Sequence, residues 1–578
     1  MTKSRPDPRS VAREGRRSSR RALVAALCAV LLLAGCSAIP TSGPVQQAEE
    51  PLSDENGNPV GYNPDGPKPD DSPKEIVEGF INAGTGTDDN YQTARKFLAP
   101  DLADSWRPDA RAWVYQGVPN IVRAPQDNTF SVTFDLTRVI NGEGISRPAS
   151  ETGEDTIKFS LTQLPEGQWR ISEAPDGIML SSDSFSRVFD SHKLYFYSPD
   201  YKYAIPDVRW FARDASVPAS LVRAMLLGPA PYLKGAVVSA FNDGTTLASP
   251  AVAVESGEAL VDLAPGAIDG TSGLQRQRMQ AQLEMTLLQL NNISSVNMTI
   301  EQREVALPEN TEPVTPVQDP DVPAVQVMLR DEELAYYQNL DVSRPNKLPE
   351  ISRLDPRDPA LSYQQDWIAF LNGKRNKLFL TGADKDVTQV LAGSNLTEPS
   401  FGPYNWLWTA EAARSGSIFA VAAGSNPPAV VSVSAEWLKG TVTDLKISRD
   451  GARALVITDS EEGSDAMIAG VLRNEDGVPT GLTQPMHLDP SVPVDRGVWV
   501  DETSVAVIKA SKTEDVQAEI LSLDSESSRI TGLEGMTHIS AGNGRQQIYG
   551  QTEDYIYLQV GNSWSRKTKN VVDPSFPG

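Results

Sequence analysis

A short pattern that returns every 40–50 residues constrains the C-terminal half of this 578-residue chain more than any other feature. Five weakly similar segments begin 43, 41, 49 and 44 residues apart: Leu361–Phe370, Tyr404–Val421, Leu445–Ile457, Val494–Ile508 and His538–Tyr549. The clearest copy, Ile447–Val456, has the pattern of a strand, an Asp-Gly turn and a second strand. Such a period is typical of β-propellers. We therefore expect an all-β propeller of about five to seven blades over residues 323–578.

Residues 72–190 show helical periodicity first and strand periodicity afterwards. Ser72–Glu75 have a capping-box pattern with proline at the first helical position, and apolar residues follow at helical spacing as far as Leu98. From Phe130 onward apolar residues alternate with polar ones, and Leu164–Ile171 has the composition of a hairpin. Helices followed by strands predict an α+β domain. The order of elements is similar to that of small cone-shaped nuclear-transport-factor-2-like (NTF2-like) domains.

A second α+β unit is expected over residues 191–305. Its first helix contains Leu221–Leu226 and ends at the Gly-Pro pair that follows. A longer helix places Met279, Leu283 and Leu287 on one face, and Val296–Ile300 then alternate as a strand. The unit precedes a proline-rich segment, residues 306–322, which predicts a hinge before the propeller.

Three stretches of this second unit resemble the GerMN domain of sporulation and envelope proteins. They are Leu226–Pro229, Phe241–Thr245 and Val261–Leu263, together with the helix-to-strand ending. The expected fold class is therefore multidomain, with an NTF2-like cone, a GerMN-like domain and a propeller in that order.

The N-terminus has the order of a secretory signal. Eight Lys and Arg residues lie among residues 1–35, and no residue from Ala22 to Gly35 is charged. A helix over those fourteen residues covers about 21 Å of a hydrocarbon core of about 30 Å, which disfavours a permanent membrane span. The stretch Leu33–Cys36 resembles a bacterial lipobox, in which the cysteine is lipidated and then becomes the first residue. Residues 1–35 are therefore interpreted as a lipoprotein signal peptide.

Cys36 is the predicted lipidation site, carrying an N-palmitoyl group and an S-diacylglycerol group. The alternative is an ordinary signal peptide with a chance cysteine. The other cysteine, Cys28, lies in the part that would be removed, so no disulfide is expected. Residues 36–71 are dense in Pro, Gly, Asp, Glu and Asn and predict a disordered tether.

The charge balance excludes nucleic acid as a partner. The chain has 52 Lys and Arg residues against 76 Asp and Glu residues, a formal net charge of -24 at pH 7. Since residues 1–35 hold eight of the bases and two of the acids, the remainder carries -30. Such a body is repelled by phosphate backbones and anionic headgroups. A mean hydropathy of -0.32 also excludes a polytopic membrane protein.

The sequence offers little catalytic chemistry. His192, His487 and His538 each stand alone in their segments, and neither a phosphate-binding loop nor a Gly-x-Ser-x-Gly elbow is present. A glycosidase needs two suitably placed carboxylates, but with so many acids the sequence singles out no pair. We therefore expect no enzymatic activity, no cofactor and no metal site.

Two tryptophans are the best candidates for a ligand surface. Trp406 and Trp408 alternate along one predicted strand, so they share a face and are expected to be exposed to a glycan or peptide. Trp367 and Trp499 lie inside apolar repeat segments and are expected in the blade core.

The order of these parts resembles one family over essentially the whole mature chain. The lipobox, the domain opening at Ile76–Phe80, the GerMN-like unit and the propeller are similar to the actinobacterial lipoprotein LpqB family. The resemblance implies association with the MtrB sensor kinase of the MtrA–MtrB two-component system, and effects on envelope homeostasis and division. It also implies a lipid anchor at the extracytoplasmic face of the cell membrane.

Three functions follow for testing. The leading hypothesis is an accessory lipoprotein that binds and modulates a sensor kinase. The second is an envelope lipoprotein that binds a glycan or peptide through the propeller or the N-terminal cone. A hydrolase is the third.

Overall fold

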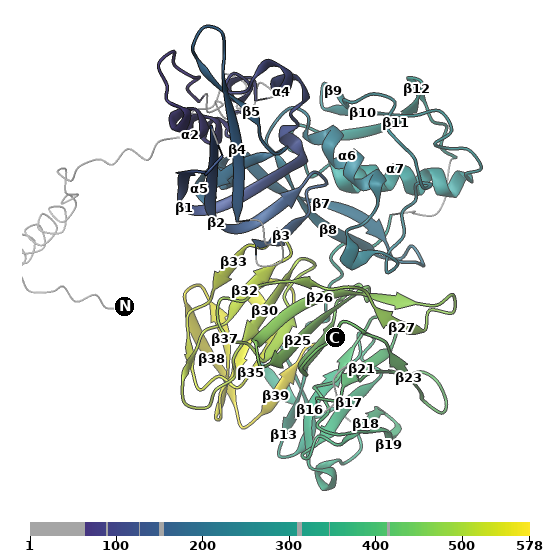
Figure 1. Cartoon of the computed structure of the whole chain (residues 1–578). Coiled ribbons are helices and arrows are strands. Elements are labelled where there is room, and N and C mark those ends of the chain that lie inside the picture. Colours follow the sequence, from purple (N-terminus) through teal and green to yellow (C-terminus); the bar gives the residue numbers. More distant parts are fainter. Residues whose placement is uncertain are drawn as a thin grey trace, which may run out of the picture. The chain divides into compact units, whose positions relative to one another are not determined.

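The computed structural model describes residues 64–87, 91–126, 128–149, 155–308, 315–345, 347–412 and 417–578. Cys36, the predicted signal peptide and most of the predicted tether lie outside these residues. Residues 62–578 form one compact unit. Mixed helices and strands occupy its first part, and short strands make up the rest (Figure 1).

The N-terminal domain consists of helices packed on one mixed sheet. Its elements are α2 (Pro73–Ala83), α3 (Gln92–Arg95), α4 (Pro100–Ser105), β1 (Arg111–Arg123), β2 (Thr129–Asn141), β3 (Ser146–Pro148), β4 (Thr156–Gln163), β5 (Trp169–Glu173), β6 (Ile178–Ser181) and α5 (Ser182–Val188). The sheet order is β5-β4-β2-β1-β6, and β3 pairs with β2. The predicted α+β class is confirmed, whereas the NTF2-like assignment stays a prediction.

Local sequence explains how this domain begins. Ser72 Oγ accepts a hydrogen bond from Glu75 N, and the Glu75 carboxylate accepts one from Ser72 N, so the predicted capping box is confirmed. The helix buries Ile76 and Phe80 against a core that also contains Phe159 of β4. Burial of these aromatic and aliphatic side chains holds α2 on the sheet.

The GerMN-like domain follows directly. A two-stranded ribbon of β7 (Phe189–Tyr197) and β8 (Ala204–Ala212) leads into α6 (Val217–Leu227), and the remaining elements are β9 (Ala253–Glu255), β10 (Glu258–Leu263), α7 (Gly273–Leu287), β11 (Ser295–Ile300) and β12 (Arg303–Glu304). β10 and β11 are parallel, and α7 connects them. The predicted helices and the closing strand are confirmed.

Six antiparallel sheets follow, and each is one blade of a propeller. Blade by blade, their strands are β39 (Val572–Ser575), β13 (Gln326–Arg330), β14 (Glu333–Gln338) and β15 (Asp341–Ser343); β16 (Pro356–Leu361), β17 (Ile368–Asn372), β18 (Lys377–Gly382) and β19 (Lys385–Ala392); β20 (Ser400–Phe401), β21 (Trp406–Ala410), β22 (Ile418–Ala422) and β23 (Ala429–Val433); β24 (Thr441–Ile447), β25 (Arg453–Ser460), β26 (Gly463–Arg473), β27 (Pro479–Leu482) and β28 (Met486–His487); β29 (Arg496–Trp499), β30 (Ser504–Ile508), β32 (Glu519–Ser522) and β33 (Ser527–Arg529); and β35 (His538–Ala541), β36 (Ile548–Gln551), β37 (Tyr555–Val560) and β38 (Ser563–Lys569). Two further short strands, β31 (Asp515–Val516) and β34 (Leu533–Glu534), pair with each other; β31 lies between β30 and β32 in the sequence, and β34 follows β33.

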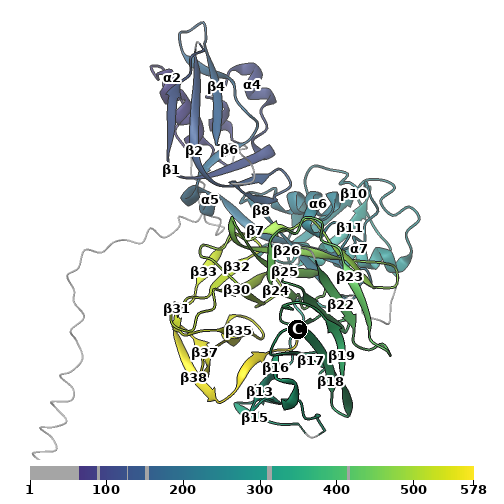
Figure 2. The same ribbon diagram turned by 60° about the horizontal axis from the view of Figure 1, so that its bottom comes forward.

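The two ends of the propeller sequence close the ring. β39 pairs with β13, with Val327 opposite Ser575 and Leu329 opposite Val572. The first blade therefore takes its innermost strand from the end of the domain, and Figure 2 shows the sheets arranged around the end of the chain. This strand exchange leaves the ring without an open edge.

The described part of the proline-rich segment differs from the expected free hinge. The amide and carbonyl of Val317 pair with the backbone of Lys202 and Ala204, both at 2.9 Å. Val322 N donates to Asn543 Oδ1 at 2.7 Å. Residues 315–322 are thus bonded to both neighbouring domains, because the residues between the prolines keep their own donors and acceptors.

Candidate functional site

Each innermost strand of the propeller supplies a titratable side chain to the axis. These side chains are Asp573 of β39, Asp358 of β16, Glu398 two residues before β20, Lys446 of β24, Arg496 of β29 and His538 of β35. Because one strand from every blade lines the axis, residues more than 200 positions apart in sequence meet there.

Glu398 is the hub of this axial charge cluster. Its carboxylate lies 3.0 Å from Lys446 Nζ, 3.9 Å from Arg375 Nη2 and 3.5 Å from His538 Nδ1, and it also pairs with Arg496. The Glu398 side chain is only 7% exposed. Three cations, those of Arg375, Lys446 and Arg496, surround this deeply buried carboxyl group and compensate for its loss of solvation.

The histidine of the cluster is held neutral. Burial, followed by the nearby Arg496 guanidinium, lowers the pKa of His538 to about 4. His538 Nε2 lies 3.1 Å from the carbonyl oxygen of Pro574, a position that suits an N–H donor. Burial and Asp573 raise the pKa of Asp358, whose carboxylate pairs with Arg375 at 2.6 Å.

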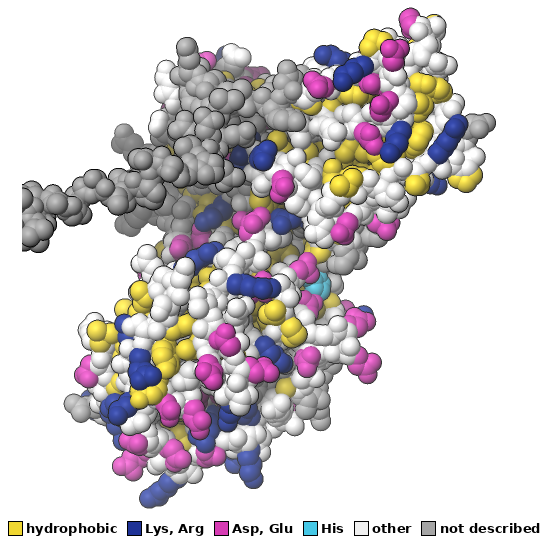
Figure 3. Space-filling model, turned by 90° about the vertical axis from the view of Figure 1, so that its left-hand side faces the viewer, with side chains coloured by type: hydrophobic (Ala, Val, Ile, Leu, Met, Phe, Trp, Pro, Cys, Tyr) yellow, Lys and Arg dark blue, Asp and Glu magenta, His cyan; other side chains and the backbone are white. Residues whose placement is uncertain are grey.

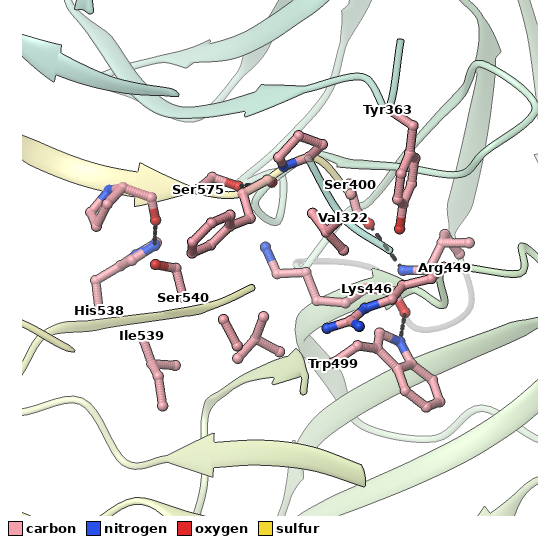
Figure 4. Close-up of a pocket in the computed structure, with 17 residues that line it drawn as sticks. Val322, Tyr363, Ser400, Lys446, Arg449, Trp499, His538, Ile539, Ser540 and Ser575 are labelled. Atoms are coloured by element: carbon pink, nitrogen blue, oxygen red, sulfur yellow. Dashed lines mark hydrogen bonds between the residues drawn. The ribbon is translucent and has the colours of Figure 1, made fainter. Parts of the chain in front are cut away.

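A cavity of about 480 Å³, which includes space open to solvent, lies beside this cluster (Figure 4). Lys446, Trp499 and His538 contribute to its wall, and Trp499 Nε1 donates to the Lys446 carbonyl at 3.1 Å. The buried Arg449 guanidinium donates to the carbonyls of Val500 and Gly542. The cations here are thus engaged by carboxylates and carbonyls, which favours a role in holding the blades together.

Metal chemistry has no support in the described ranges. Within them, no group of three or more His, Cys, Asp or Glu side chains is placed to hold a metal ion. His192 lies half-buried on β7, His487 pairs with Asp465 at 2.6 Å on β26 and β28, and His538 lies on the propeller axis.

A second region joins the GerMN-like domain to the propeller. One continuous cluster of buried apolar side chains runs from Leu194 and Met225 of the GerMN-like domain to Leu455 and Ile468 of the fourth blade. All four are fully buried. The two domains therefore share a core, which we call the seam.

Glycine at position 470 lets the backbones approach closely at the seam. A Cβ atom at Gly470 would lie 2.7 Å from the Tyr232 carbonyl oxygen and 2.7 Å from Ala236 Cβ. The neighbouring Thr483 hydroxyl donates to the same Tyr232 carbonyl at 2.5 Å. Any larger residue at position 470 would therefore push the two domains apart.

Polar groups fix the register of the seam. Lys193 Nζ lies 2.6 Å from the Glu502 carboxylate, and Tyr195 OH donates to the same oxygen at 3.0 Å. On the propeller side the fully buried Arg453 pairs with Asp450 and donates to the Glu502 carbonyl at 2.7 Å. Buried ion pairs contribute little net stability but disfavour misaligned packing, because an unpaired buried charge is costly.

The N-terminal domain contacts the propeller through a smaller, polar region. Arg138 donates to the carbonyls of Asp524 and Ser525 at 3.3 and 3.2 Å, and its guanidinium stacks over Phe185 and Trp210. Trp210 of β8, in the GerMN-like domain, donates from Nε1 to the same Asp524 carbonyl at 3.0 Å. This contact rests on a few hydrogen bonds rather than on a shared core.

The tryptophan prediction is wrong for one of its two residues. Trp408 is fully buried among Ala420, Val456 and their neighbours, whereas Trp406 is half-buried at the edge of the same cluster. The shared face of the strand packs against the next blade, and so Trp408 is not part of an exposed ligand surface. Trp499 is in the core as expected, and Trp367 is partly buried.

Sequence reasoning missed the axial charge cluster and the seam. A signal for the cluster was present, since the charged Lys446 stands between the apolar residues Leu445 and Ile447 at the end of an expected strand. A charge inside a buried strand indicates a buried partner. The partners come from other blades, and no local pattern connects them.

Family models match three consecutive parts of the chain. The model for the lipoprotein LpqB N-terminal domain matches residues 66–186, and that for sporulation and spore germination matches residues 193–306. The model for the lipoprotein LpqB beta-propeller domain matches residues 339–577.

Curated relatives extend these matches over nearly the whole chain. Lipoprotein LpqB of Thermobifida fusca is 26% identical, with 96% of this chain and 99% of the relative covered. Lipoprotein LpqB of Streptomyces coelicolor is also 26% identical, with 98% and 99% covered. Among solved structures, TolB from Acinetobacter baumannii aligns with a TM-score of 0.33 and 13% identity, over 44% of this chain and 66% of that one.

In the described ranges, no helix is both long enough and apolar enough to cross a bilayer.

Proposed function

Because the chain belongs to the LpqB family of lipoproteins, we propose that it is a non-enzymatic accessory lipoprotein that binds and modulates an MtrB-like sensor kinase. Lipid on Cys36 anchors it at the extracytoplasmic face of the cell membrane. Two or more acyl chains give a stable anchor, at about 0.8 kcal/mol per buried methylene. The kinase part that it meets is the extracytoplasmic sensor domain.

The observation that carries this proposal is the seam. A shared apolar core makes the GerMN-like domain and the propeller one preorganised body, and binding to a rigid body loses less conformational entropy than binding to hinged domains. Propeller loops gathered on one rim add recognition surface next to the GerMN-like domain. Such a body suits protein recognition better than catalysis.

The net charge of the protein should also affect how fast it associates with its partner. Acidic side chains on the face in Figure 3 are interspersed with Lys and Arg rather than gathered in one patch. The net charge of -30 on the chain after residue 35 still favours a relatively basic partner surface, and it accelerates encounter. Association should therefore slow as the Debye length falls from about 10 Å towards 3 Å with rising salt.

Capture of the kinase sensor domain by the lipidated protein in detergent tests the proposal. Gly470→Val should weaken capture, because the added side chain separates the two halves of the binding body. Gly424→Val is the matched control, since a Cβ there meets nothing within 4 Å. Thr483→Ala removes one seam hydrogen bond and should have a smaller effect. No capture by the unmodified protein would contradict the proposal.

The anchor is tested separately. Cys36→Ala should abolish incorporation of radiolabelled palmitate and block cleavage before residue 36. Labelling that persists unchanged would show that lipid is attached elsewhere.

A further inference from the structure

A large open cavity lies in the N-terminal domain. It encloses about 1110 Å³ including space open to solvent, more than twice the 480 Å³ of the axial cavity. Its walls come from the C-terminal half of α2, the end of the buried part of β1, the last three residues of β6 and the helix α5. A site of this size accommodates a small organic molecule.

The floor of the cavity is apolar. Ile81 of α2 and Met179 and Leu180 of β6 are almost fully buried and line it, with Tyr115 at the side. The small exposed parts of these side chains, and the half-buried Val188 that also lines the cavity, gain free energy when a ligand covers them. The floor therefore suits the apolar body of a ligand.

The rim carries hydrogen-bond donors that are not used within the protein. In the part of the chain that the structure describes, the side chains of Asn82 and Arg187 make no hydrogen bond or ion pair. Ser184 Oγ accepts a bond from Ser181 Oγ, which leaves its own hydrogen available. Ser184 and Arg187 are three residues apart on α5 and so share a face of the helix.

The charges of the rim favour an acceptor-rich ligand group. Arg187 provides a permanently charged fork that matches carboxylate and phosphate geometry. Asp65 is the one carboxylate among the lining residues, and it competes with an anion only where it approaches Arg187. No ion pair joins the two within the described ranges.

We propose that this cavity binds a small anionic amphiphile, with its carboxylate or phosphate head on Arg187, Ser184 and Asn82 and its apolar body on Ile81, Met179 and Leu180. The site goes beyond the proposed kinase binding and does not depend on it. The seam and the cavity lie on different domains, so either can fail without the other.

Equilibrium dialysis of radiolabelled decanoate against the lipidated protein in nanodiscs tests the site, with binding to empty nanodiscs subtracted. Saturable binding at one site per chain is expected. Decyl phosphate and unlabelled decanoate are added as competitors of the radiolabelled decanoate. The compound that displaces it at the lower concentration shows whether the site prefers a phosphate or a carboxylate head. Decanol should compete at least about tenfold less well than either, because it lacks the charge that Arg187 binds.

Two variants separate the head from the apolar floor. Arg187→Gln should weaken decanoate binding about tenfold or more, whereas Arg147→Gln, an exposed arginine on β3 of the same domain, should leave it unchanged. Asn82→Trp at an exposed rim position should narrow the cavity and weaken all ligands. Thermal unfolding of each variant establishes that it is folded.

Three results would overturn the proposal. They are no saturable binding above empty nanodiscs, equal competition by decanol and decanoate, and equal binding by Arg187→Gln and the unmodified protein. Kinase capture by Arg187→Gln should match the unmodified protein, which keeps this test distinct from that of the proposed function.

Discussion

The N-terminal domain and the GerMN-like domain differ in how they are built into the chain. The N-terminal domain has its own core, from Ile76 to Phe185, and from the ribbon that follows it adds Phe189, Trp210 and the partly buried Ala212. The GerMN-like domain instead shares its core with two propeller blades. Two domains of the same α+β class thus have different degrees of independence.

The difference shows that domain class does not determine autonomy. A domain whose apolar surface is closed by its own elements can open alone, whereas one that completes its core with a neighbour opens with that neighbour. On this account the GerMN-like domain and the propeller form one cooperative unit and the N-terminal domain a second. The following variants test that division.

Asp450→Ala should have the largest effect. It leaves the fully buried Arg453 without its carboxylate, which costs about 3–5 kcal/mol of unfolding free energy. The loss should appear in the joint unit and leave the N-terminal domain unchanged, as measured by denaturant unfolding. Asp450→Ala with Arg453→Met should recover part of the loss, because the unpaired charge is gone. A loss confined to the propeller would argue against a joint unit.

Leu455→Ala should destabilise both parts of the joint unit together. Leu455 is fully buried in the shared core, and such truncations cost about 2–5 kcal/mol. Leu161→Ala is the matched truncation in the core of the N-terminal domain. Domain-resolved proteolysis should show that each variant sensitises only its own unit. If either variant made all three domains more sensitive to proteolysis, the division into two cooperative units would be contradicted.

His538 should make the propeller lose stability in mild acid. Its pKa is about 4 in the folded state and about 6.5 when unfolded, so the unfolded chain binds the proton first. Stability should therefore be complete above pH 6.5 and fall as the pH drops from 6.5 to about 4. The raised pKa of Asp358 acts in the opposite sense. The free energy of unfolding of the unmodified protein and of His538→Gln should be measured between pH 4 and pH 7, because the difference between the two isolates the contribution of the histidine. If both free energies fall in parallel as the pH drops, this assignment is contradicted.

Ser72→Ala should have the smallest effect. It removes the capping bond to Glu75 N and costs about 1 kcal/mol, in the N-terminal domain only. Thermal unfolding should show a lower midpoint for that domain, with Ser105→Ala on the exposed side of α4 as the control. A shift in the joint unit would mean that the two units are coupled.

Local patterns predicted the fold class well. Three predicted elements that depend only on neighbouring residues are confirmed: the capping box at Ser72, the hairpin at Leu164–Ile171 and the long helix after residue 272. Four of the five repeats correspond to the first hairpin of a blade, and Tyr404–Val421 corresponds to the second hairpin, β21–β22, of the third blade. The blade closed by β39 and β13 left no repeat, because its strands come from opposite ends of the domain.

Contacts between distant segments could not be predicted. Trp408 looked exposed because alternation places Trp406 and Trp408 on one face of a strand but does not say that the next blade covers Trp408. The pairing of Glu398 with Lys446 and Arg496 depends on the closure of the ring. The seam likewise requires Tyr232 to meet Thr483, which lie 251 residues apart.

Native-state hydrogen exchange in increasing denaturant tests the joint unit most directly. Peptides from α7 of the GerMN-like domain and from β25 of the propeller should lose protection at the same free energy of opening, while peptides from α2 and β4 open at a different one. Loss of protection in α7 while β25 stays protected would contradict the account, because the seam would then join two independent domains.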